Sequence, residues 1–283
     1  MTRKALLWIL GAAWLQLCQA APAVGVPEAQ ADAFMRKSGL WQQLAEIEPG
    51  VQQGIAQSDA ELRQLNDEQL ERLREAGRAA YGADRLRSAM RTELAASLPA
   101  AETEQALRFL ATDLGKRATA LEEAAATPEN SARIETIADD AFAALAPARK
   151  DLIERMVKAT RAGEFAASII INQQLGIMRG IAVYAGRADS ESQNDAKARL
   201  NRYRDQMVTT LGRRMIAHSA VIYGPLSDED LAKYIDFLES PAGEQTNNAV
   251  SAALDKVLGA AAFELGRRIG DAVKPPDPTS TRT

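Results

Sequence analysis

The sequence predicts an all-α protein, a helical array built from two diverged copies of one multi-helix unit. Alanine is abundant among the 283 residues, and leucine, arginine, glutamate and glutamine recur throughout, all of them strong helix formers. Apolar residues recur at helical spacing, as in the stripe Leu231, Tyr234, Ile235 and Leu238. Runs of β-branched and aromatic residues that alternate with polar ones are missing, so no strand is expected.

The N-terminus has the three-part layout of a secretory signal peptide. Two basic residues near the start precede the apolar stretch 5–17, which is shorter than the roughly 20 residues that span a bilayer. Small residues flank a cut between Ala20 and Ala21. We therefore expect residues 1–20 to be a signal peptide and the protein to be periplasmic, with no transmembrane anchor after cleavage. The alternative is a retained N-terminal anchor.

Cys18 is the single cysteine of the chain. It leaves open an outer-membrane lipoprotein that is lipid-modified at Cys18, although Leu17 stands where that motif has a small residue. Cleavage after Ala20 would remove Cys18. The mature chain would then have no disulfide, no thiolate nucleophile and no cysteine-based metal site.

The charge of the chain argues against a nucleic-acid partner. The net charge is -4, and residues 1–20 contain two basic residues and no acid, so the mature chain would have a charge of -4 - 2 = -6. Binding to phosphates requires clustered lysine and arginine. No nucleic-acid partner is expected.

Capping patterns mark the expected helix boundaries. Helices are expected to start after Asn66, Thr127, Ser190 and Ser227, and to stop near Gly82, Gly186 and Gly224. The proline-rich end, residues 273–283, cannot continue a helix and is expected to be a disordered tail.

Self-comparison predicts an internal duplication. Four residues recur at a constant offset of 128 positions (226 - 98): Leu98, Phe109, Leu110 and Gly115 match Leu226, Phe237, Leu238 and Gly243. Earlier in the chain, Gly39 and Trp41 match Gly163 and Phe165 at an offset of 124 (165 - 41). We therefore expect a first helical repeat over 28–126, and a linking helix with a second repeat over 127–272. The alternative is that helical stretches of this composition slide into partial register.

The second half of the chain resembles a known bacterial exported family. An acidic helix start at 226–231, an aromatic step from Tyr234 to Phe237, and Ser-Pro-x-Gly over 240–243 resemble the family catalogued as domain of unknown function two-zero-five-nine. The first half departs from this pattern, with Ala106 in place of Tyr234 and Asp113 in place of Pro241. The resemblance implies a helical domain of the periplasm or outer envelope, and it implies no catalytic residues.

Few residues with catalytic or metal-binding chemistry are present. His218 is the single histidine, so a nucleophile–histidine–acid triad or a histidine metal site has almost no material. The acid pairs Glu122–Glu123 and Asp139–Asp140 are adjacent on helices, so their side chains point in different directions. We expect no catalytic residue, no metal site, no cofactor and no enzymatic activity.

One apolar stretch suggests a groove. Gly176 and Gly180 lie four residues apart within 165–184, a spacing that lets another backbone approach closely. One interpretation is a tightly packed internal helix. The other is a helix that lines an apolar groove, with Trp41 and Phe165 at matching places beside it.

Three hypotheses about function follow. The first is an interaction or adaptor protein of the cell envelope, because a duplicated helical unit multiplies surface. The second is a binding module for an apolar small molecule such as a lipid or acyl chain, held between helices. The third, a hydrolase, ranks last.

Overall fold

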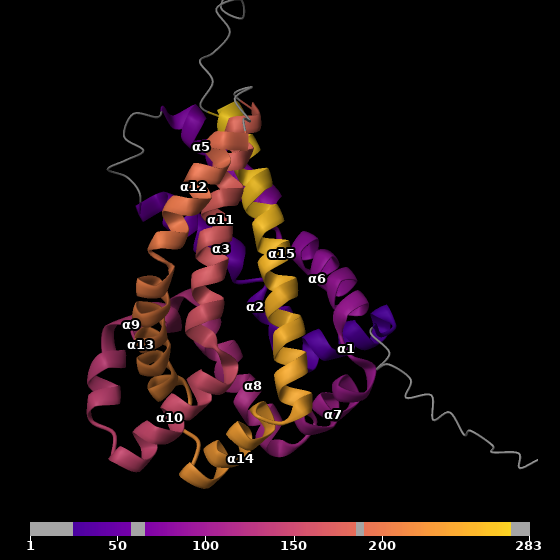
Figure 1. Ribbon diagram of the computed structural model, residues 1–283, viewed down its shortest axis with the longest axis vertical. Helices are drawn as coiled ribbons and strands as arrows, with labels where there is room; N and C mark the ends of the chain where they lie inside the picture. Colours follow the sequence, from indigo (N-terminus) through magenta and orange to yellow (C-terminus); the bar gives the residue numbers. More distant parts are fainter. Residues whose placement is uncertain (1–24, 58–65, 185–189, 273–283) are drawn as a thin grey trace, which may run out of the picture.

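The computed structural model describes residues 25–57, 66–184 and 190–272. These residues form helices and no strand, which confirms the all-α class (Figure 1). The expected signal peptide 1–20 with its cut between Ala20 and Ala21, Cys18, and the expected tail 273–283 lie outside the described residues. No helix among the described residues has both the length and the apolar character needed to cross a bilayer.

The described residues fold into a series of helices. In chain order they are α1 (Glu28–Lys37), α2 (Leu40–Gln43), α3 (Ile47–Gln57), α5 (Asp67–Tyr81), α6 (Ala83–Ser97), α7 (Ala100–Leu110), α8 (Asp113–Ala126), α9 (Pro128–Ala143), α10 (Pro147–Thr160), α11 (Ala162–Tyr184), α12 (Ser190–Arg202), α13 (Arg204–Ile222), α14 (Asp228–Leu238) and α15 (Pro241–Ala272).

Several helix starts have the expected caps. The side chain of Asn66 accepts a hydrogen bond from the backbone N–H of Gln69 at 2.9 Å, and the Gln69 side chain accepts one from the Asn66 backbone at 3.0 Å. Ser227 accepts from the backbone N–H of Asp230 at the start of α14, at 3.1 Å. These bonds satisfy backbone donors that a helix start leaves without partners.

Each half of the chain contributes a helix to a hydrophobic core formed mainly by the other half. The larger core is formed by α1, α2, α5, α6 and α7 of the first half together with α15, the last helix (Figure 1). Ala253, Val257 and Ala261 of α15 are buried there. In return, α8 supplies Ala118 to a cluster with α10 and α14. A third cluster joins Ile134 of α9 with Ala217 of α13. The first two of these cores therefore combine helices from both halves of the chain.

Residues matched in the sequence comparison meet in space. The rings of Phe109 and Phe237 stack with centroids 3.9 Å apart and planes 5° apart. Gly115 and Gly243 have the same surroundings: a Cβ would lie 2.3 Å from the Phe109 carbonyl oxygen and 2.2 Å from that of Phe237, respectively. An internal duplication would produce such equivalences, although the duplication itself stays a prediction.

A buried arginine ties α10 to the turn between α13 and α14. Arg149 donates to the carbonyl oxygen of Tyr223 at 2.7 Å and to Asp228 Oδ1 at 2.8 Å. Arg149→Met is expected to lower the free energy of unfolding by about 2 kcal/mol in urea titrations, because it removes charge-assisted bonds and leaves a carbonyl without its donor. Arg155→Met is the control on the same helix, since Arg155 makes exposed ion pairs with Asp236 and Glu239. An equal loss in both variants would contradict the account.

Candidate ligand-binding cavity

The backbones of α11 and α15 cross in close contact. A Cβ on Gly180 would lie 2.2 Å from the Phe263 carbonyl oxygen, and one on Gly266 would lie 2.2 Å from the Ile177 carbonyl oxygen. Gly176 also approaches α15, where a Cβ would lie 2.8 Å from the Gly259 carbonyl oxygen. Because only glycine fits at such distances, the face of α11 that contains Gly176 and Gly180 packs tightly against α15. Other side chains of the same stretch, such as Met178 and Val183, are exposed.

The two helices separate toward the N-terminal ends of both (Figure 1). A cavity lies at this end, lined by residues such as Phe165 of α11 and Thr246 of α15. Its volume is about 250 Å³. Side chains from both halves of the chain form its wall, including Phe34, Leu40, Ala106, Leu110, Glu122, Phe165, Tyr234, Phe237, Leu238, Thr246, Val250 and Leu254. Most of this lining is apolar, so the cavity suits an apolar guest.

One wall of the cavity contains a buried carboxyl group held by two tyrosines. Glu122 Oε1 accepts hydrogen bonds from the hydroxyls of Tyr223 at 2.6 Å and Tyr234 at 2.7 Å. Burial raises the pKa of Glu122 above 4.5, while the two tyrosine hydrogen bonds act in the opposite direction. Burial also raises the pKa of both tyrosines. The cluster therefore places a satisfied polar group in an otherwise apolar wall.

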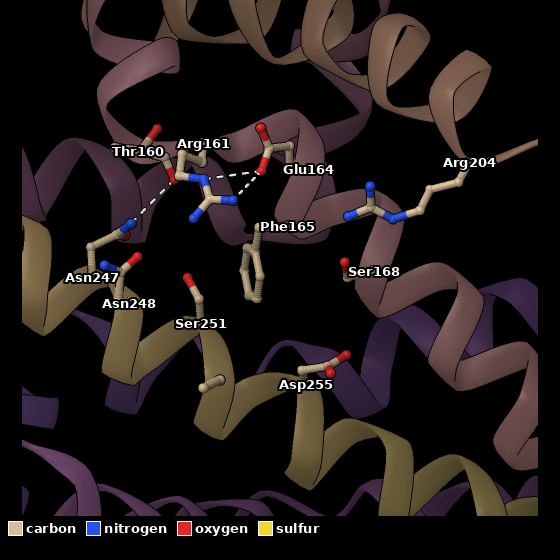
Figure 2. A pocket seen from close by; sticks show the side chains of 11 residues that line it. Thr160, Arg161, Glu164, Phe165, Ser168, Arg204, Asn247, Asn248, Ser251 and Asp255 are labelled. Carbon is tan, nitrogen blue, oxygen red and sulfur yellow. Dashed lines mark hydrogen bonds and ion pairs between the residues drawn. The ribbon is translucent and has the colours of Figure 1, made fainter. Parts of the chain in front are cut away.

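A polar depression of about 200 Å³ adjoins the cavity, and Figure 2 shows it from close by. Phe165, Asn247 and Ser251 line both spaces, and the Phe165 ring points from α11 into the gap toward α15. At the rim, Arg161 Nε donates to Glu164 Oε2 at 3.0 Å. We call this depression the polar mouth. An apolar cavity beside a polar mouth is an arrangement that suits an amphipathic molecule.

The structure separates the residues that the sequence grouped as a groove. Phe165 lies at the cavity and Gly176 lines another pocket between α11 and α15, whereas Gly180 is buried in the helix crossing. Trp41 lines none of these pockets, and its ring lies against the guanidinium groups of Arg36 at 3.7 Å and Arg87 at 4.6 Å. Of the four proposed residues, only Phe165 therefore reaches the cavity.

The sequence did not single out the polar cluster at the cavity wall. In the sequence, Glu122 stands out only as one half of the acid pair with Glu123, because its tyrosine partners lie 101 and 112 positions away in the chain. No pattern of neighbouring residues in the sequence indicates that side chains so far apart in the chain will meet. His218 stays apart from the cavity lining and contacts Glu135 at 3.1 Å.

Neither a scan of protein-family models nor searches of curated proteins and solved structures found a match to this chain. The resemblance to the exported family therefore stays a prediction. No group of His, Cys, Asp and Glu side chains suited to a metal ion occurs among the described residues. By its fold and site, the protein is an all-helical protein with an apolar cavity between the two halves of its chain.

Proposed function

We propose that the protein binds a small amphipathic molecule, with the apolar part in the cavity and the polar group at the polar mouth. The observation that supports this function is the mainly apolar cavity beside Phe165, which side chains from both halves of the chain line. Binding sites for small molecules are typically concave and apolar, with a few polar groups that fix orientation. Asn247 and Ser251 are such groups, because they line both the cavity and the polar mouth. The proposal is a non-enzymatic one.

The size of the cavity limits the ligand. Its volume of about 250 Å³ exceeds the roughly 150 Å³ of an apolar cavity that holds benzene. It lies just below the roughly 300–1,000 Å³ of pockets for drug-sized ligands. A short alkyl chain therefore fits, and a complete phospholipid does not.

A titration with 1-octanol tests the proposal. Isothermal calorimetry on the full chain is expected to show one saturable site, and Val250→Phe is expected to weaken binding at least tenfold, because the larger ring fills the cavity beside Leu254. Ala260→Phe is the control, since Ala260 is an exposed residue of the same helix. No saturable binding by the wild type, or equal binding by the Val250 variant, would refute the proposed function.

One observation favours the adaptor role as a second candidate. Large apolar side chains stand exposed at the C-terminal end of α11, with Met178 50%, Val183 45%, Ile181 39% and Tyr184 39% exposed. This concentration of exposed apolar side chains at one end of a helix favours a contact surface. A photo-crosslinker at Val183 in intact cells tests this role: one defined envelope protein is expected, and only random neighbours would count against it.

Export is part of the proposal. Cleavage of the expected signal peptide would leave Ala21 as the first residue of the mature protein. N-terminal sequencing of the protein from a periplasmic extract is therefore expected to begin Ala-Pro-Ala-Val. A protein that starts at Met1, or one whose N-terminus is a lipid-modified Cys18, would contradict this expectation.

A further inference from the structure

A third pocket of about 530 Å³ lies between α11, α12 and α15. It shares Asp255 with the polar mouth, and none of its lining residues lines the apolar cavity. Its apolar side is formed by Leu175, Met178, Ala182 and Phe263. Met178 is half exposed, so apolar surface within the pocket is open to a ligand.

Positive charge gathers around this apolar surface. Arg179 of α11, Lys197 of α12 and Lys256 of α15 line the pocket, and Asp255 is the one acid that does so. The side-chain amide of Asn172 already donates hydrogen bonds to both carboxylate oxygens of Asp255, at 2.7 and 2.8 Å. The excess of cations contrasts with the net charge of -4 of the chain.

Within the part of the chain that the structure describes, two of these cations have no acidic partner. Among the side chains that the structure describes, neither Arg179 nor Lys197 forms an ion pair, whereas Lys256 pairs with Glu93 at 2.7 Å. The guanidinium of Arg179 lies 5.9 Å from the centre of the Phe263 ring, within the range of a cation–π contact. This contact places the charge of Arg179 beside the apolar surface. Two cations from two different helices, neither in an ion pair with a described side chain, therefore border one apolar pocket.

We propose that this pocket binds a second class of ligand, an amphiphile with one alkyl chain and an anionic head group. The chain would cover Leu175, Met178 and Phe263, and Arg179 and Lys197 would pair with the carboxylate or phosphate of the head group. Both residue types bind such oxyanions through charge-assisted hydrogen bonds. This site is separate from the cavity proposed to bind octanol, so an experiment can refute either proposal without refuting the other.

Titrations with twelve-carbon amphiphiles below their micellar concentrations test this site. Dodecanoate and dodecyl phosphate are expected to bind the full chain at least tenfold more tightly than dodecyltrimethylammonium or dodecyl maltoside. The two anionic probes distinguish a carboxylate ligand from a phosphate ligand. Affinity is expected to fall as salt is added, because the partners are exposed charges. Equal affinity for the cationic amphiphile would overturn the proposal.

Variants locate the binding. The double variant Arg179→Gln, Lys197→Gln is expected to lose at least tenfold in affinity for the anionic probes. Arg213→Gln is the matched control, because Arg213 is an exposed arginine of α13 that lines none of the three pockets. Val250→Phe is expected to leave dodecanoate binding unchanged, which separates this site from the cavity. Unchanged affinity in the double variant, or loss of dodecanoate binding in Val250→Phe, would place the anion elsewhere and refute the site.

Discussion

Gly266→Ala is expected to destabilise the protein by about 3 kcal/mol, the upper end of the typical cost of overpacking. The new Cβ would lie 2.2 Å from the carbonyl oxygen of Ile177 and 2.8 Å from its Cα. Both atoms belong to the backbone of α11, so no side chain can rotate away. The helices would have to move apart. Urea unfolding of the variant and the wild type measures the difference.

Gly259→Ala is the control for this prediction. Gly259 lies on the same helix as Gly266, but a Cβ there would meet no atom within 4 Å. Alanine is the better helix former by roughly 1 kcal/mol, so this variant is expected to be stabilised by up to about that amount. The two substitutions thus have opposite expected signs. A loss of similar size in both variants would contradict the close crossing of α11 and α15.

Glu122→Leu is expected to lower the free energy of unfolding by about 3 kcal/mol. Leucine would leave the buried hydroxyls of Tyr223 and Tyr234 without their shared acceptor, and each such group costs about 1–3 kcal/mol. Glu122→Gln is the control, because the amide oxygen can still accept both bonds. Equal stability of the leucine variant and the wild type in urea titrations would mean that the cluster does not stabilise the fold.

The same carboxyl group predicts a dependence of stability on pH. The folded state raises the pKa of Glu122 above 4.5, so the folded protein holds this proton more tightly than the unfolded chain does. Its stabilising contribution is fully present below the unfolded pKa and is lost as the pH rises through the folded pKa. As the pH rises above about 4.5, Glu122→Gln should therefore gain stability relative to the wild type. If the difference in the free energy of unfolding between the two proteins stayed constant with pH, the raised pKa of Glu122 would be contradicted.

Local patterns in the sequence predicted the helical class and several helix starts. The capping pair Asn66 and Gln69 forms as expected, because such caps depend only on residues within one turn. The break between α12 and α13 at Tyr203 was not predicted. No proline or glycine stands at that position, so the sequence has no local signal for a helix end there.

The sequence could not predict which helices pack together in each core, or which residues line the cavity. Helical periodicity shows which face of α15 is apolar, but it does not show which helices cover that face. Phe165 was identified because it lies beside the apolar stretch of α11. Glu122 was not, because its role depends on Tyr223 and Tyr234, which approach it only when α8 packs against helices of the other half.

Location of a bound chain by crystallography tests the central claim most directly. We expect crystals soaked with 8-bromo-1-octanol to show an anomalous bromine peak inside the cavity, between Leu110, Phe165 and Val250. The peak should be absent from crystals of Val250→Phe soaked in the same way. Bromine found only outside the cavity, in crystals of a wild-type protein that binds the alcohol in solution, would contradict the account.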